Sequence, residues 1–101
     1  MQKQMQNDKV KYLEGLDMML KDIVSKSTSD YGLAFSRARK FHKTVIEWHD
    51  SKVIDDETAT KIRQQCRIVP DYDCCKPDEF RIIFQGIRQT VQLALVDAIL
   101  V

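Results

Sequence analysis

The chain has 101 residues, 44% of them hydrophobic and 31% charged, which predicts one folded domain over residues 1–101 and excludes a disordered chain. Its formal net charge of +1 excludes a whole-molecule attraction to nucleic acid or to an anionic membrane, so only local patches are candidates for such contacts. No apolar run approaches the roughly 20 residues that cross a bilayer, and the N-terminal sequence lacks an apolar signal region, so we expect a cytoplasmic protein without membrane contact.

Apolar residues recur at spacings of three and four, which is the period of an α-helix and not that of a β-strand. This pattern predicts an all-α, bundle-like domain of about four helices with no strand. The first helix is expected over residues 7–25, and residues 1–6 before it are expected to fray. One face of this helix gathers its apolar side chains: Met5, Tyr12, Leu13, Leu16, Met19, Leu20, Ile23 and Val24.

Four polar residues at positions 27–30 separate the first helix from the second. Their side-chain oxygens can accept hydrogen bonds from the unpaired amides of a following helical turn, so this segment is expected to end one helix and begin the next. The second helix is predicted over residues 31–49, because spacings of three and four hold throughout its apolar stripe: Tyr31, Ala34, Phe35, Ala38, Phe41, Val45 and Trp48.

A third, short helix is expected to begin at a cap formed by Asp55 or Asp56 and to end near Val69. Its apolar side is thin, because it consists only of Ala59, Ile62, Cys66 and Val69. A loop over residues 70–76 is expected to connect this helix to the last one.

The fourth helix is the most informative element, because it is apolar on two sides. It is expected to begin at Pro77, whose missing amide suits a first helical turn, and to run nearly to the last residue. One stripe consists of Phe80, Ile83, Phe84, Ile87, Val91, Leu95 and Ala98. A second stripe on a nearly opposite side consists of Ile82, Leu93, Val96 and Leu100, with Gly86 near its edge, where a missing side chain would let another backbone approach.

A helix that is apolar on both sides is either central in a bundle or shared between molecules. Four helices offer little material to cover both faces, so our leading hypothesis is that the second stripe contacts a protein partner, with a homodimer as the expected assembly. A central core helix is the alternative. The candidate partner-binding residues are Ile82, Leu93, Val96 and Leu100.

Basic residues cluster on the second helix, where Arg37, Arg39, Lys40 and Lys43 occupy the side away from the apolar stripe. Arginines of the third and fourth helices would extend this positive surface if those helices lie alongside, and such a surface binds phosphates. The nearly balanced total charge and the lack of a helix-turn-helix spacing favour instead an ordinary solvated face. Nucleic-acid binding through these four residues is therefore the alternative function.

Two histidines, His42 and His49, lie seven residues apart on the apolar side of the second helix. They have three interpretations: satisfied core or interface histidines, a pH-responsive contact, or a zinc site completed by Cys66 or by Cys74 and Cys75. Seven residues is about 10 Å along a helix, whereas two ligands for one ion usually stand three or four residues apart. We therefore predict no metal site.

Catalytic motifs are absent from the sequence, because it has no Gly-rich phosphate loop, nucleophile elbow or CxxC pair. The odd number of cysteines, with Cys74 and Cys75 adjacent, argues against a secreted disulfide scaffold. We therefore predict a non-enzymatic adaptor, inhibitor or regulator that binds a protein and needs no cofactor. Two topologies are consistent with the patterns, an antiparallel bundle and an intertwined dimer.

Overall fold

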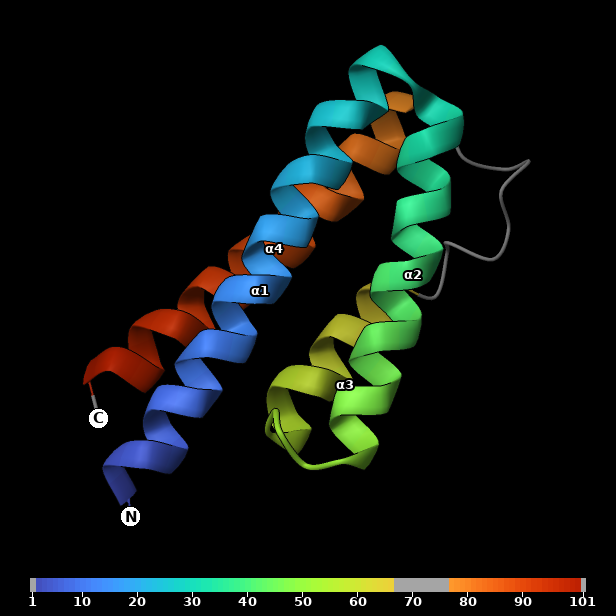
Figure 1. The fold of residues 1–101 in the computed structure, drawn as a ribbon. Helices are drawn as coiled ribbons and strands as arrows, with labels where there is room; N and C mark the ends of the chain where they lie inside the picture. The colour runs from blue at the N-terminus through green and yellow to red at the C-terminus, as the bar shows by residue number, and fades with distance from the viewer. Residues whose placement is uncertain (1, 67–76, 101) are drawn as a thin grey trace.

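Four helices make up the part of the chain that the computed structural model describes, residues 2–66 and 77–100 (Figure 1). They are α1 (Gln2–Ser29), α2 (Tyr31–Asp50), α3 (Asp56–Gln65) and α4 (Pro77–Leu100). Side chains are described for residues 9–66 and 78–100. No strand occurs in the described stretches, so the predicted all-α fold is confirmed.

Local hydrogen bonds explain why α1 is longer than predicted. The helix continues to Ser29 because the hydroxyls of Ser27 and Thr28 donate to carbonyl oxygens one turn back, at 2.6 and 2.9 Å. Such bonds allow serine and threonine to stay inside a helix instead of capping the next one. Asp30 is the residue that caps α2, since its carboxylate accepts a hydrogen bond from the N–H of Leu33 at 3.2 Å.

The other helix ends lie closer to their predicted positions. α2 and α4 agree with the prediction to within about one residue. α3 ends at Gln65 with Cys66 as its C-cap residue, before the expected end at Val69, which lies outside the described residues. α1 begins at Gln2, earlier than expected, and fraying of residues 1–6 stays a prediction.

The helices pack as two neighbouring pairs. Figure 1 shows α1 and α4 side by side, with both chain ends at the same end of the pair, so these two helices run antiparallel. α2 packs against α1, and α3 packs against both α2 and α4. The described residues therefore form a single elongated globule of 45 × 22 × 17 Å, as a bundle-like fold requires.

The core lies between the apolar stripes of the four helices. Phenylalanines of α4 occupy its centre: the rings of Phe80 and Phe84 lie 4.6 Å apart, and Phe80 also meets Tyr31 of α2 edge-on at 5.3 Å. The predicted inner stripe of α4 is therefore confirmed for its buried members, which are Phe80, Phe84, Ile87, Val91 and Ala98. Although α4 is the most apolar helix, none of the helices in residues 2–66 and 77–100 has the length and hydropathy needed to span a membrane.

Candidate functional site

Four large apolar side chains lie exposed along one side of α4. Their exposed fractions are 63% for Ile82, 68% for Leu93, 51% for Val96 and 78% for Leu100. These are the four residues that the sequence offered as partner contacts, and we name them the outer stripe. Their exposure contradicts the alternative in which they belong to the core of a central helix. That they bind a partner stays a prediction.

The outer stripe faces solvent because of its position around the helix. Successive residues of an α-helix are rotated by about 100°, which places Ile82 and Leu93 on the side opposite Phe84 and Val91. Phe84 and Val91 are fully buried against the rest of the bundle. α1 is also tied to α4 by a polar contact, since Arg88 Nε donates to Asp17 Oδ1 at 2.9 Å. The inner side of α4 is thus covered by other helices, whereas the described residues leave its outer side exposed.

The structure adds one apolar residue that the sequence pattern missed. Ile99 is 65% exposed and lies one turn beyond Val96, so it widens the apolar surface at the C-terminal end of α4. The signal was present in the spacing of three between these two residues. It was overlooked because Ile99 falls between the two predicted stripes and belongs to neither.

A small groove between α3 and α4 borders the outer stripe at Leu93. Its volume is about 160 Å³, which is below the roughly 300 Å³ at which pockets for small molecules begin. Its wall combines polar and apolar side chains from the two helices: Glu57, Thr58, Lys61, Thr90, Leu93, Ala94 and Asp97. The groove suits the edge of a larger protein contact and does not suit an enclosed ligand.

Two of the basic residues on α2 contact other residues of the same chain. Arg37, Arg39, Lys40 and Lys43 are all exposed on α2, as predicted. Arg37 nevertheless pairs with Asp22 of α1, and the guanidinium of Arg39 lies over the Phe35 ring at 5.0 Å. Both contacts engage guanidinium groups that would otherwise be available to bind phosphates.

The arginines expected to extend the basic surface also have contacts of their own. Arg81 pairs with Asp78 at 3.3 Å, and Arg88 pairs with Asp17. Arg63 donates toward His49, and Arg67 lies outside the described residues. A continuous positive surface is therefore not assembled from the described arginines. The nucleic-acid hypothesis stays a prediction, which a gel shift at low and moderate salt would test.

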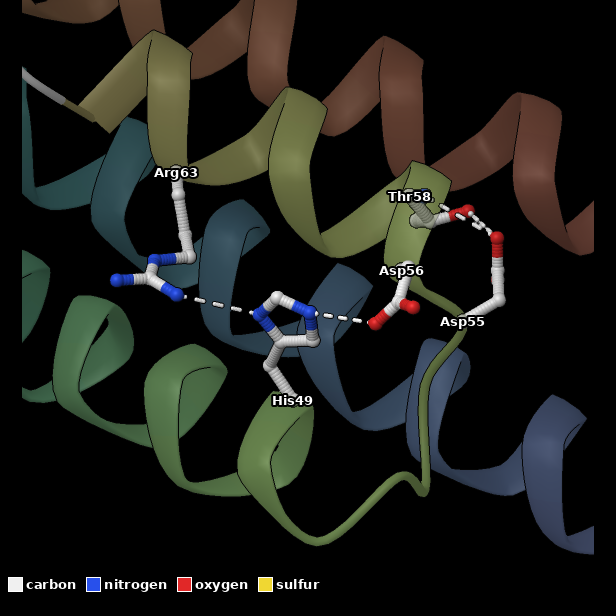
Figure 2. Close-up of polar contacts among 5 residues, drawn as sticks. All are labelled: His49, Asp55, Asp56, Thr58 and Arg63. Atoms are coloured by element: carbon white, nitrogen blue, oxygen red, sulfur yellow. Dashed lines mark hydrogen bonds and ion pairs between the residues drawn. The ribbon is translucent and has the colours of Figure 1, made fainter.

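His49 forms a polar bridge between the end of α2 and both ends of α3 (Figure 2). Its Nε2 lies 2.8 Å from Asp56 Oδ1, and its Nδ1 lies 3.2 Å from Arg63 Nη1. A guanidinium can only donate, so Nδ1 accepts and the proton on Nε2 is donated to Asp56. Of the three interpretations, that of a histidine satisfied by polar partners fits His49.

Asp55 caps α3 beside this bridge, as the sequence predicted for Asp55 or Asp56. Its carboxylate accepts hydrogen bonds from the N–H of Thr58 at 3.1 Å and from the hydroxyl of Thr58 at 3.0 Å (Figure 2). Burial by itself raises the pKa of the Asp55 carboxyl, but these bonds and the Lys9 ammonium at 3.4 Å together lower the pKa below its ordinary value. The cap is therefore strongest when the carboxyl is ionised.

Metal-ligating side chains do not gather in the described stretches. No group of three or more His, Cys, Asp or Glu residues that could hold an ion occurs there, and His49 has polar partners other than His42. Burial raises the pKa of the Cys66 thiol to about 12, so this residue stays protonated near neutral pH and is a poor ligand or nucleophile. Cys74 and Cys75 lie outside the described residues.

Comparison with known proteins identifies no relative. No family model matches the chain, and neither a curated protein nor a solved structure matches it. Function must therefore be argued from the surface of the molecule, and the outer stripe is its most unusual feature.

Proposed function

We propose that this protein is a non-enzymatic binding protein, an adaptor, inhibitor or regulator, whose outer stripe receives the apolar face of a helix from a protein partner. The observation that carries the proposal is the exposure of Ile82, Leu93, Val96 and Leu100 along one side of a regular helix. Contiguous exposed apolar patches of more than a few hundred Å² are uncommon on proteins that act alone. Covering such a patch releases free energy of roughly 25 cal/mol per Å² of apolar surface.

The chemistry around the stripe favours a protein over a membrane surface. Helices that lie on membranes carry lysines and arginines beside their apolar face, which attract anionic lipids. The exposed polar neighbours of the outer stripe on α4 are instead acids and glutamines, namely Asp78, Glu79, Gln85, Gln89, Gln92 and Asp97. Lys61 of α3 lines the small groove together with Leu93. Glutamines and acids, with a single lysine across the groove, suit the polar rim of a protein interface better than an anionic membrane.

The shape of the stripe favours a helical partner. Leu93, Val96 and Leu100 follow each other at intervals of three and four, which presents their side chains in one row along the helix axis. A second amphipathic helix has side chains at the same period, which can insert between the side chains of this row.

The compartment is proposed on separate grounds. Cys66 is a free, buried thiol. Free thiols persist in the reducing cytoplasm, whereas exported proteins tend to pair their cysteines. We therefore place the action of this protein in the cytoplasm.

The test is a double substitution, Leu93→Glu with Val96→Glu, in a tagged full-length chain. The matched control is Thr60→Glu with Gln64→Glu, which adds the same charge to exposed positions on α3. Quantitative affinity capture should show proteins, or an untagged copy of the chain, that the original and control chains retain and the stripe variant loses by tenfold or more. Far-ultraviolet circular dichroism should show that all three chains stay helical.

Two results would overturn the proposal. Equal retention of every captured protein by the stripe variant would show that the outer stripe binds nothing. Unfolding of the stripe variant, with the control still folded, would show that these residues stabilise the fold instead of a complex.

A further inference from the structure

The outer stripe is part of a longer regular series on α4. Intervals of four and three residues separate Ile82, Gly86, Gln89, Leu93, Val96 and Leu100, and we name these six residues the α4 seam. Alternating intervals of four and three residues are the pattern with which two helices pack along one line. We infer, on the basis of the proposed function, that the partner helix is α4 of a second copy, packed antiparallel along this seam.

Gly86 is the seam position that lies next to α3. No glycine of the described residues has a positive φ, and a Cβ at Gly86 would meet only the side-chain nitrogen of Gln65, at an ordinary contact distance of 3.7 Å. Glycine is less favourable than alanine inside a helix. Gln65 of α3, held by a hydrogen bond from Thr90 at 2.9 Å, borders Gly86 on one side, and a helix that approaches along the seam would meet no side chain at this position.

Charge on the seam suits two identical surfaces. The positions beside the seam are Ile83, Gln85, Thr90, Gln92, Asp97 and Ile99, and Asp97 is the charged residue among them. Like charges repel each other when two identical surfaces meet, so a contact line with little charge permits self-association. In an antiparallel pair the two Asp97 residues stand on opposite sides of the centre, about 18 Å apart along the axis.

An antiparallel register centred at residue 91 gives complementary layers. It pairs residues of one copy with residues of the other as follows: Ile82 with Leu100, Gly86 with Val96, and Gln89 with Leu93. Each large apolar side chain then meets a different residue, and the smallest seam residue meets a branched one. The pairing is the same from either copy, which is what a two-fold dimer requires.

A parallel register fits the same seam less well. It places Gly86 opposite Gly86, which leaves a void, and Gln89 opposite Gln89. The seam spacing continues to Glu79, an exposed acid. In a parallel pair Glu79 would lie opposite Glu79 of the other copy, and the two charges would repel each other. The two helix dipoles would also point the same way. The geometry therefore favours the antiparallel dimer.

The closing experiment is cross-linking between two chains that each carry one introduced cysteine. One full-length chain carries Ile82→Cys and the other Leu100→Cys, each with Cys74→Ser and Cys75→Ser, so that the introduced cysteine is the reactive one beside the buried Cys66, which is kept. In the antiparallel register a mixture of the two chains should form a disulfide joining residue 82 to residue 100, at ten times or more the yield of either chain alone. The two copies of residue 82 would stand about 27 Å apart, too far to bridge.

The outcomes separate the register from the proposed function. If each variant by itself forms disulfide-linked dimers at the same yield as the mixture, the pair is parallel and the inference is overturned. A monomer by light scattering, up to concentrations at which the affinity capture works, would also overturn it. In that case a different protein retained by the outer stripe would still support the proposed function. A control chain with Gln64→Cys should stay unlinked in every mixture.

Discussion

α4 and α3 lie next to each other but are held in the fold by different means. α4 has 24 residues and buries a row of phenylalanine and aliphatic side chains, while its opposite side exposes a second apolar row. α3 has 10 residues, buries Thr58, Ala59 and Ile62, and is fixed at its start by the Asp55 cap and the His49 bridge. The short α3 thus relies on contacts at its ends, whereas α4 has more apolar surface than the described fold buries.

The sharpest test of this comparison is within α4, between its two faces. Phe84→Ala should lower the free energy of unfolding by about 3–5 kcal/mol, because it removes a fully buried ring from the core. Leu93→Ala should change it by less than about 1 kcal/mol at concentrations where the chain is monomeric, because Leu93 is exposed. Denaturant unfolding at several protein concentrations measures both. Equal losses would show that both faces serve the fold.

The next effect concerns the start of α3, where neighbouring acids have unequal roles. Asp55→Ala should lower the free energy of unfolding by about 1 kcal/mol, because Asp55 accepts two hydrogen bonds from Thr58. Asp56→Ala should lower it by less than about 0.5 kcal/mol, since the exposed Asp56 carboxylate makes one contact with His49. Thermal unfolding at pH 7 ranks the two variants. A larger loss for Asp56→Ala would place the essential contact in the His49 bridge.

The smallest expected effect is a dependence of the free energy of unfolding on pH, which arises from His42 of α2. Burial and, secondarily, the charge of Arg63 lower the pKa of His42 below its ordinary value of 6.5. The unfolded chain then binds more protons than the folded chain, so the stability due to neutral His42 is present above about pH 6.5 and is lost as pH falls toward the folded pKa.

A His42→Gln variant isolates this contribution from that of other groups. The difference in melting temperature between the original chain and the variant should shrink or reverse as pH falls from 7.5 to 5.5. Parallel pH profiles for the two chains would show that His42 does not contribute to the pH dependence. The change is expected to be smaller than that produced by Asp55→Ala.

The sequence predicted the helical period and the two apolar sides of α4, because both depend only on the order of residues. It did not decide whether Leu93 and Val96 are core or surface, since that depends on which helices cover α4. It also placed the end of α1 too early, because Ser27 and Thr28 can bond to carbonyls of their own helix as readily as they cap another.

The polar bridge could be predicted only in part. Asp55 or Asp56 was recognisable as a cap from its position before a helix. The partners of His49 were not recognisable, because Arg63 comes 14 residues later and reaches the imidazole only once α3 folds back along α2. Contacts between helices depend on their packing, which a single sequence does not encode in its local pattern.

One contact between α1 and α2 gives the molecule an internal optical probe. Trp48 is the single tryptophan of the chain, and its ring meets Tyr12 of α1 edge-on at 4.8 Å. Tryptophan emission shifts to longer wavelength when water reaches the indole. The wavelength of that emission therefore reports whether α1 and α2 remain packed against each other, both when α4 is unbound and when a partner is bound to it.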